Sequence, residues 1–561
     1  MGSSVQNEIT IDEATQPPVQ SDKQKQTREL KNLEIAPTSN FQPIEGKRTR
    51  TRVLVAEIAD LPKRQADFSA AKQEELTQFI ENDVFEEINK RLVPANVKIL
   101  GSRWLLTEKR LDGHNVNKKA RIVVQGCYQV KGVDDDESYS PVMSTSSLRT
   151  IIAIATTRRW KIHQMDVKTA YLNAPLTGEV YVRPPMDVRC EDKIWKIKKA
   201  MYGLPQAGRD WFNTFTSFLK HLDFIQCQAD SCVFTKKNII IGVYVDDLAL
   251  AAENETILEE VKNKLKERFK MKDLGVISSI LGIQVNQQDC GVTLNQSIYI
   301  EECIARFKLS EATPSELPLN TSKDLTSPHV PAGLLDEKAK QKYQQMVGCL
   351  MYLAVMTRPD ITFSAALLSR FNAKPDQRHY IAVKHVFRYL KATKSRGISY
   401  HHDNYNLIAF ADSDYAGDQS KSRSTTGYLV LVAGGPVEWV SKRQDYVAKS
   451  TMEAELVAMS SASDCVRWVK MFIGEAMSDL DSIQEITINC DSRSAVDTAN
   501  NGIVNRKTRH YRVRVHAIHE DIENHEIKVI WIPTKSQVAD FLTKALPRES
   551  FKNCLTGAGI L

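Results

Sequence analysis

Two adjacent aspartates, Asp246 and Asp247, lie between two apolar runs in the segment NIIIGVYVDDLALAA. This pattern predicts a β-hairpin with both carboxylates at its tip. Adjacent carboxylates repel each other, and both stay ionised most easily when a divalent cation lies between them and a phosphate. An isolated pair of aspartates is more often a solvated turn, but the tetrad YVDD between two apolar strands favours a metal site.

A third acid that could share this site lies upstream, in KIHQMDVKTAYLNAPL. Asp166 ends an apolar segment, and Tyr171 follows it five residues later. Phosphoryl transfer to a nucleotide needs two Mg²⁺ ions about 3.5 to 4 Å apart, bridged by carboxylates from separate strands. Asp166 and Asp246 could supply that bridge.

A second acidic set lies in the last third of the chain. Its members stand where an apolar element ends or turns polar: Asp412 after a first strand, Glu455 on a long helix, Asp491 after a later strand and Asp540 on the last helix. Such a quartet can bind two Mg²⁺ ions and direct a metal-activated water at an RNA phosphodiester. Four scattered surface acids are the alternative.

Apolar periodicity indicates the elements that position these acids. Residues 1–60 are polar and predict a disordered linker. A helix is expected around Leu76, Phe79 and Ile80, followed by a hairpin made of RWLLTEKR and KARIVVQG. An amphipathic helix is expected further on, with one apolar face made of Ile257, Leu258, Val261, Leu265 and Phe269.

A stretch rich in Pro, Ser and Thr, at about 310–340, predicts an internal linker before mostly helical sequence. From about residue 405 the expected order is strand, hairpin, long helix, strand, short helix, strand and helix. The chain of 561 residues suggests three or four folding units at about 150 residues each.

Composition excludes a membrane or disordered protein. The chain is 42% hydrophobic and 26% charged, with a mean hydropathy of −0.34. Ten cysteines without a CxxC pair read as reduced intracellular thiols, and no apolar run approaches the roughly 20 residues that cross a bilayer. The net charge of +6 would suit a polyanionic partner but is also ordinary for a soluble protein of this length.

Four segments resemble, in order, the reverse-transcriptase motifs of copia-type LTR retrotransposon Pol polyproteins: KARIVVQG, QMDVKTAYLNAPL, YGLPQAGRDWF and YVDDLAL. The resemblance implies a right-hand fold of fingers, palm and thumb. It makes Asp166, Asp246 and Asp247 the palm acids, with Asp247 the less essential of its pair, and implies two Mg²⁺ ions per active site, with Mn²⁺ as an alternative.

The same matching implies further substrate-binding residues. Lys119 and Arg121 resemble the cations that hold the incoming triphosphate, although they could also be ordinary surface cations. Gln206 resembles a residue that contacts the nucleotide, and Gly208 would permit close backbone approach there. Tyr171 resembles an aromatic gate against ribonucleotides; a packed palm residue is the alternative.

Two further residues belong to a predicted turn. Leu281 and Gly282 resemble the turn that grips the primer end, although a simple strand turn explains the pattern nearly as well.

The later segments ADSDYAGD, RSTTGYLV, STMEAELVAMS, NCDSRSAVD and QVADFLTKAL resemble the ribonuclease H domain behind copia-type reverse transcriptases. Asp412 or Asp414, and Glu453 or Glu455, remain alternatives, because glutamates two apart on a helix point about 200° apart and only one can face the metals. Asp412 and Glu455 are preferred, since ELVA resembles the helix pattern of ribonucleases H.

Two features surround this second set. The stretch NRKTRHYRVRVHAIH could hold the phosphates of a hybrid through Lys507, Arg509, His510 and Arg512, or be a solvated charge run. The loop before Asp540 carries no histidine, unlike that of cellular ribonucleases H, so product release is expected to work differently.

The expected fold is therefore α+β: a right-hand polymerase followed by a mixed α/β ribonuclease H-like domain. The expected ranges are 65–310 for fingers and palm, 311–400 for thumb and connection, and 401–555 for the nuclease. The absence of zinc-knuckle, protease and integrase signatures predicts that the chain is the last part of a polyprotein.

The expected function is an RNA-directed DNA polymerase with ribonuclease H activity. Its expected partners are an RNA template, a DNA primer, the RNA–DNA hybrid, deoxynucleoside triphosphates, and integrase and capsid proteins of the same element, with no membrane. The expected location is cytoplasmic, in a virus-like particle that could enter the nucleus. The alternative is a decayed or domesticated copy that only binds nucleic acid.

Overall fold

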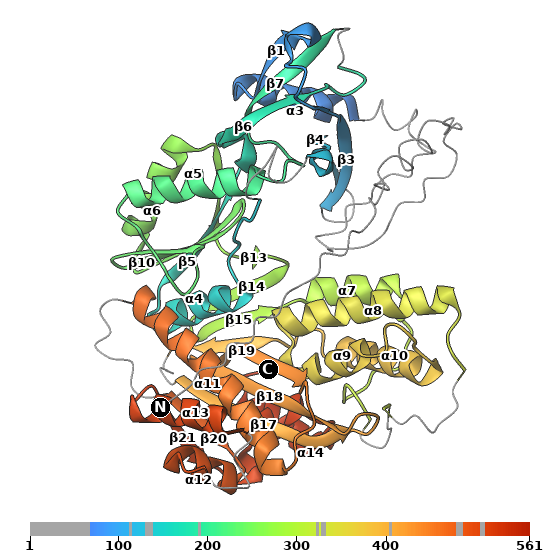
Figure 1. Ribbon diagram of the computed structural model, residues 1–561, viewed down its shortest axis with the longest axis vertical. Helices are drawn as coiled ribbons and strands as arrows, with labels where there is room; N and C mark the ends of the chain where they lie inside the picture. The colour runs from blue at the N-terminus through green and yellow to red at the C-terminus, as the bar shows by residue number, and fades with distance from the viewer. Residues whose placement is uncertain are drawn as a thin grey trace, which may run out of the picture. The chain divides into compact units, whose positions relative to one another are not determined.

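The computed structural model describes residues 68–561 except 112–114, 130–137, 189–191, 321–324, 327–332, 403–406, 478–485 and 505–510. The predicted N-terminal linker and the candidates Lys507, Arg509 and His510 lie outside the described residues. No helix in the described part of the chain is both long and apolar enough to cross a membrane. Within the described ranges the elements form five sheets with helices around them, so the predicted α+β class is confirmed (Figure 1).

The first part of the described chain contains the predicted helix and hairpin. Helix α3 (Ser69–Glu81) buries Phe79 but leaves Ile80 exposed, and it packs on the long hairpin of β3 (Ser102–Leu111) and β4 (Asn115–Val124). A neighbouring sheet has the order β1-β7-β6-β2. Its strands are β1 (Phe85–Asn89), β2 (Ile99–Leu100), β6 (Pro175–Val182) and β7 (Lys193–Lys199).

A six-stranded sheet with the order β12-β5-β11-β10-β9-β8 positions the first acidic set. Its strands are β5 (Lys161–Val167), β8 (Ile225–Gln226), β9 (Val233–Lys236), β10 (Ile239–Tyr244), β11 (Asp247–Ala252) and β12 (Met271–Val276). Both faces are covered, because alternate residues of β10 and β11 enter two different apolar clusters. Helices α5 (Ala207–His221) and α6 (Glu255–Arg268) cover one face, and α4 (Thr145–Thr157) covers the other.

The amphipathic pattern predicted for α6 is confirmed. Leu258, Val261 and Leu265 are buried along the helix, Phe269 is buried directly after it, and Ile257 is half-buried. Asn254 caps the helix by accepting a hydrogen bond from the Ile257 backbone N–H at 3.0 Å.

A four-stranded sheet and a group of helices follow. The sheet has the order β13-β14-β15-β16, with β13 (Ser279–Ile280), β14 (Ile283–Gln288), β15 (Gly291–Asn295) and β16 (Ile398–His401). The helices are α7 (Ser297–Arg306), α8 (Glu337–Met356), α9 (Thr362–Ser369) and α10 (Gln377–Ala392). The described residues of the Pro, Ser and Thr-rich stretch before residue 334 form no helix and lie against α10, where Ser315 N–H donates to the Arg388 carbonyl, and α8 begins within the last part of the predicted linker.

The last sheet positions the second acidic set. Its order is β19-β18-β17-β20-β21, with β17 (Leu407–Asp418), β18 (Arg423–Val432) and β19 (Gly435–Arg443) antiparallel, and β20 (Ile486–Cys490) and β21 (Ile527–Trp531) parallel to β17. The long helix α11 (Thr451–Ala476) packs on β17 and β18 (Figure 1). Three shorter helices complete this part: α12 (Arg493–Asn501), α13 (Arg512–Glu523) and α14 (Arg548–Gly557).

Three expectations for this last sheet were wrong in detail. Two helices, α12 and α13, stand between β20 and β21 where one was expected, and α13 takes up much of the basic stretch. Asp540 lies on a short 3-10 helix, η9 (Val538–Leu542), and α14 follows it, so Asp540 is not on the last helix. The strand expected to end at Asp412 is longer, because β17 continues to Asp418. Its register with β18 shifts between Asp414 and Asp418, as at a β-bulge.

A buried seam joins α4 of the six-stranded sheet to β19 of the five-stranded sheet. The Arg149 guanidinium donates from Nε to the Val437 carbonyl at 2.8 Å and from Nη1 to the Val355 carbonyl at 2.7 Å, and it lies 4.0 Å from the centre of the Trp439 ring. Trp439 Nε1 in turn donates to the Ala354 carbonyl at 2.9 Å. This seam buries a charge with its hydrogen bonds satisfied, which fixes the geometry of the elements that supply the carbonyls.

Two more contacts extend the seam. Trp468 of α11 donates from Nε1 to the Ala229 carbonyl at 3.0 Å, and strand β16, which precedes β17 in the chain, pairs with β15. The two acidic sites therefore stand on sheets that share one packed interior.

Candidate functional site

The predicted hairpin tip is confirmed. Tyr244 pairs with Asp247 across β10 and β11, which leaves Val245 and Asp246 as the two turn residues. Val245 has φ of 58°, a conformation that a β-branched residue adopts only at a cost in free energy. Trp211 of α5 stabilises the turn by donating from Nε1 to the Val245 carbonyl at 2.7 Å.

The third acid of the first set lies on the neighbouring strand. Asp166 of β5 is the register partner of Asp247, and the Val167 N–H donates to the Asp246 carbonyl at 2.8 Å. Asp166, Asp246 and Asp247 are all half-buried. The structure thus brings the three predicted palm acids to one edge of a sheet, as hard oxygen ligands suited to Mg²⁺.

Both predicted cations lie on β4, and one of them, Lys119, is in the electrostatic neighbourhood of these acids. Lys119 is close enough to Asp166 and Asp246 for both carboxylates to raise its pKa, although desolvation and Arg121 lower it overall. Buried Glu75 of α3 accepts a hydrogen bond from the Ile122 N–H at 3.2 Å and lies in the same electrostatic neighbourhood. A side chain of the hairpin is therefore influenced by the charges of acids on another sheet.

The predicted gate and nucleotide contact lie beside the same acids. Tyr171 is half-buried on a 3-10 helix, η5 (Ala170–Asn173), directly after β5. Gln206 is 3% exposed at the start of α5, and its amide oxygen and nitrogen have no hydrogen-bond partner among the described residues. Burying an amide without partners is costly, so this side chain is suited to receive a ligand.

The glycine near this site packs closely. A Cβ at Gly208 would lie 3.1 Å from the Ser140 Cβ, so the first turn of α5 passes tightly against that segment. The close approach at Gly208 is therefore to another segment of the protein, and not to a space that a nucleotide could occupy.

Leu281 and Gly282 form the two-residue turn between β13 and β14, and both have positive φ, 53° and 77°. The pattern is that of a type I′ hairpin turn. Tyr352 of α8 donates from its hydroxyl to the Leu281 carbonyl at 2.9 Å, and a Cβ at Gly282 would lie 2.3 Å from that hydroxyl. Only glycine fits there without displacing the tyrosine.

The second acidic set converges as predicted. Asp412 and Glu455 are buried, Asp540 is 9% exposed, and Asp491 is half-buried directly after β20. Carboxylate oxygens of Glu455 and Asp491 lie within 4.8 Å of each other and of the Cys490 sulfur. Asp412 interacts electrostatically with both Asp540 and Asp491.

Burial and mutual repulsion shift these groups. Desolvation, followed by repulsion from its neighbours, raises the pKa of Asp412 to about 7 and raises the pKa of Glu455 well above its usual range. Desolvation likewise raises the pKa of Asp540. Carboxylates gathered in this way have the oxygen donors and the excess negative charge that fit Mg²⁺, whereas burial raises the pKa of the Cys490 thiol and keeps it a poor ligand.

Sequence reasoning missed two residues that complete this cluster. Lys544 pairs with Asp540 at 2.8 Å and lies 3.8 Å from a carboxylate oxygen of Asp412, and Thr543 donates a hydrogen bond to Asp412. The signal was present, since Lys544 follows Asp540 by four residues, the spacing at which helical neighbours meet.

Glu453 and Asp414, the alternatives to Glu455 and Asp412, have partners outside the cluster of acids. Glu453 accepts from the Lys449 N–H at 2.7 Å and, through its own N–H, donates to Ser450 at 3.1 Å, so it caps α11. Asp414 is paired electrostatically with Lys544 and Arg370 rather than with the other acids. The geometry therefore favours Glu455 and Asp412 as members of the cluster.

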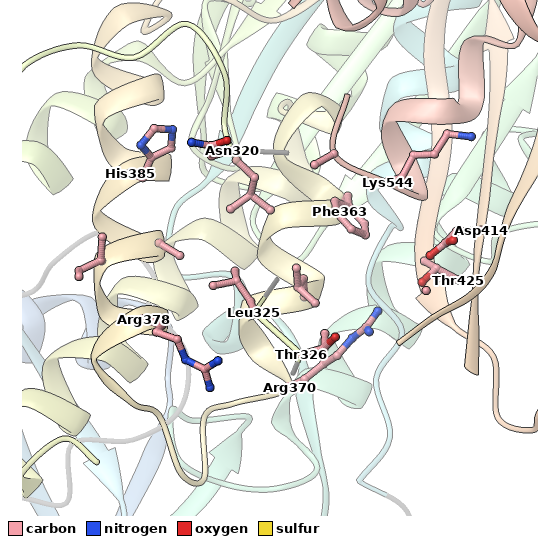
Figure 2. Close-up of a pocket in the computed structure, with 16 residues that line it drawn as sticks. Asn320, Leu325, Thr326, Phe363, Arg370, Arg378, His385, Asp414, Thr425 and Lys544 are labelled. Carbon is pink, nitrogen blue, oxygen red and sulfur yellow. The ribbon is translucent and has the colours of Figure 1, made fainter. Parts of the chain in front are cut away.

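A cavity of about 510 Å³ adjoins the cluster on the side of α9 and α10. Figure 2 shows Arg378 and His385 of α10 on one wall, with Asp414, Thr425 and Lys544 opposite them. Asp414 thus lines the cavity on the same side as Thr425 and Lys544.

Comparison with known proteins identifies the family. Residues 83–321 match the family described as reverse transcriptase (RNA-dependent DNA polymerase). The chain is 33% identical over 309 residues to the putative transposon Ty5-1 protein YCL074W of Saccharomyces cerevisiae, a match that covers 53% of this chain and 98% of the yeast protein. The chain belongs to the Pol family of copia-type retrotransposons.

Plant relatives extend the match across most of this copia-type chain. It is 35% identical over 499 residues to the retrovirus-related Pol polyprotein from transposon TNT 1-94 of Nicotiana tabacum, covering 86% of this chain and 37% of the polyprotein. The corresponding figures for transposon RE1 of Arabidopsis thaliana are 33% identity, 83% and 32%. The chain thus spans about a third of the length of these polyproteins.

Solved structures give looser matches. The foamy viral protease-reverse transcriptase in complex with dsDNA has a TM-score of 0.49 at 14% identity, over 92% of this chain and 94% of that chain. LC11-RNase H1 in complex with an RNA/DNA hybrid has a TM-score of 0.20 at 16% identity, over 25% and 94%. Neither superposition assigns a role to a residue of the copia-type chain.

Proposed function

We propose that the chain is an RNA-directed DNA polymerase that also degrades the RNA of the resulting hybrid. The observation that carries the proposal is the presence of two separate carboxylate clusters, each on its own sheet, within one chain. Residues 65–310 would form fingers and palm, 311–400 thumb and connection, and 401–555 the nuclease. The other activities of the longer polyproteins are not assigned to it.

In the polymerase, Asp166 and Asp246 would hold two Mg²⁺ ions, with Mn²⁺ as an alternative and Asp247 as a supporting ligand. When bound, the ions supply Lewis acidity toward the primer hydroxyl and the pyrophosphate. Lys119 and Arg121 neutralise the triphosphate through charge-assisted hydrogen bonds. This role is supported by the influence of both Asp166 and Asp246 on the pKa of Lys119.

The side chains around these acids orient the other substrates. Gln206 offers its unpartnered amide to the incoming nucleotide. Tyr171 limits the space below its sugar, and the Leu281–Gly282 turn supports the primer end. An RNA template and a DNA primer are therefore the substrates that this arrangement suits best.

In the nuclease, Asp412, Glu455, Asp491 and Asp540 would hold the Mg²⁺ ions that activate a water against the RNA phosphodiester. Lys544 and Thr543 orient Asp540 and Asp412 through the contacts described above. Arg509 and His510, which lie outside the described residues, would contact the backbone of the hybrid.

The setting of the reaction follows from the family. Integrase and capsid proteins of the same element are the proposed partners, in a cytoplasmic virus-like particle that could enter the nucleus. No membrane role is proposed.

The test is to incubate the purified chain with an RNA template, a labelled DNA primer and deoxynucleotides, and separately with a labelled RNA–DNA hybrid. Mg²⁺-dependent primer extension together with Mg²⁺-dependent RNA cleavage is the expected result. Binding of the hybrid without either reaction would instead favour the decayed or domesticated copy that only binds nucleic acid.

A further inference from the structure

Tyr202 connects two parts of the proposed nucleotide site. Its ring meets the Tyr171 ring edge-on, with centroids 4.9 Å apart and an interplanar angle of 63°. The Arg121 guanidinium lies over the Tyr202 ring, 4.8 Å from its centre. One aromatic ring therefore touches both the proposed sugar gate and a proposed triphosphate-binding cation.

The backbone of Tyr202 is attached to the strand that carries this cation. The Tyr202 carbonyl accepts from the Val124 N–H of β4 at 2.8 Å. The next residue, Gly203, has φ of 93°, and a Cβ there would lie 2.1 Å from the Val124 carbonyl oxygen. The close approach of this turn to β4 thus requires glycine at position 203.

We propose that Tyr202 is a positioning residue that couples Arg121 to Tyr171 and thereby sets the discrimination between deoxynucleotides and ribonucleotides. The proposal rests on the proposed polymerase function and adds a residue to it. Tyr202 does not touch the sugar; it acts through the side chain that does.

The physical argument concerns rigidity. A gate excludes a 2′-hydroxyl only if its ring cannot move away. Tyr171 is half-buried on a short 3-10 helix and packs against the apolar cluster below it, and Tyr202 supplies a ring contact in addition. An aromatic neighbour in edge-on contact restricts the ring at little cost in side-chain entropy. A guanidinium on the same neighbour adds a cation–π attraction and links its position to that of the triphosphate.

The experiment compares Tyr202→Met and Tyr202→Phe in the full chain. Methionine keeps most of the volume but is flexible, whereas phenylalanine keeps the ring and loses only the hydroxyl. We measure single-nucleotide extension with a deoxynucleotide and with the matching ribonucleotide. Tyr202→Met should raise the ratio of ribonucleotide to deoxynucleotide use about fivefold, the factor equivalent to about 1 kcal/mol of aromatic contact. Tyr202→Phe should keep the wild-type ratio.

A matched control is available in Tyr128, which also lies under a cation, with Lys98 Nζ 5.4 Å from its ring centre, but is 56% exposed. Tyr128→Met should leave the ratio unchanged. A Tyr202→Met protein that loses both reactions in equal proportion would show that Tyr202 only packs, which overturns the proposal. A Phe variant that behaves like Met would overturn the role of the ring.

A double-mutant cycle separates this proposal from a general packing effect. If Tyr202 acts through Tyr171, Tyr202→Met should change the ratio in the wild type but not in a Tyr171→Val background. Additive effects would contradict the coupling. If the wild-type chain itself does not extend a primer, the proposed polymerase function is wrong. That result is distinct from a failure of the Tyr202 proposal, which is read from the variants of an active wild type.

Discussion

The two acidic sites of this chain differ in where their compensating positive charge comes from. The proposed palm acids are half-buried where two interior strands of a sheet end, and the proposed triphosphate-binding cations, Lys119 and Arg121, stand on a different sheet. Three of the four proposed nuclease acids are more deeply buried, Asp491 is half-buried, and Lys544 lies among them, 2.8 Å from Asp540.

The difference indicates two kinds of preorganisation. The proposed palm site would be completed by the placement of the β3–β4 hairpin, so its specificity would depend on side chains that connect the two sheets. The proposed nuclease site has its acids and its cation in one packed unit, so its geometry would be largely fixed before a hybrid arrives. Each prediction below tests one side of this contrast.

Asp246→Asn has the largest expected effect. It removes a ligand while keeping the shape of the side chain, so primer extension should fall by at least about a thousandfold, since several kcal/mol of transition-state stabilisation are lost. Cleavage of a hybrid should be unchanged because Asp246 lies on another sheet. Both rates are measured on one preparation, with the exposed acid Glu253, changed to Gln, as the control. Near-normal extension by Asp246→Asn would exclude Asp246 from the metal site.

Asp491→Asn is the reciprocal change. Hybrid cleavage should fall by a similar factor of about a thousand while DNA synthesis is kept, because the cluster loses a carboxylate that lies close to Glu455. Asp497→Asn, at an exposed acid of α12, is the matched control. If Asp491→Asn also stops polymerisation, the two sites are not independent and the contrast fails.

Tyr171→Val tests the dependence of the palm site on shape. Relief of one steric clash should raise ribonucleotide incorporation at least about tenfold, equivalent to about 1.4 kcal/mol, with deoxynucleotide use largely kept. Single-nucleotide extension gives both rates. An equal decline with both substrates would mean that Tyr171 packs and does not select.

Lys544→Met should have the smallest effect, on stability rather than on chemistry. Without this cation the buried carboxylates repel each other more strongly, so the metal-free protein should lose about 1 to 2 kcal/mol of unfolding free energy, and Mg²⁺ should recover part of it. Thermal unfolding with and without Mg²⁺ measures the change. Lys442→Met, which removes an exposed lysine 3.9 Å from Asp445, should have almost no effect. Equal losses in the two variants would argue against a built-in cation.

Local patterns were sufficient to predict the elements that carry the acids. The alternation of apolar and polar residues around YVDD predicted the hairpin, and the spacing of Leu258, Val261 and Leu265 predicted α6. In each case the signal lies within one or two adjacent elements, where periodicity and burial agree.

Contacts between distant segments could not be predicted in the same way. Nothing in the sequence near Arg149 indicates that its partners are carbonyls about 200 and 290 residues later. The spacing of Lys544 from Asp540 is a local signal, but the contact of Lys544 with Asp412 of β17 is not. The second helix before β21 was hidden by the charge of its segment, which resembles a solvated run as much as a helix.

The seam around Arg149 has a consequence for the modularity of the chain. A protein truncated before residue 398 would lose strand β16, leaving β15 as an open sheet edge, and would leave a buried guanidinium without its Val437 acceptor. The α4 side of the palm core would also become exposed to solvent. The part of the chain before β16 is thus not a unit that can be cut free at this point: expressed alone, it should aggregate, and recombination that exchanges only the part from β16 onward would have to preserve this buried surface.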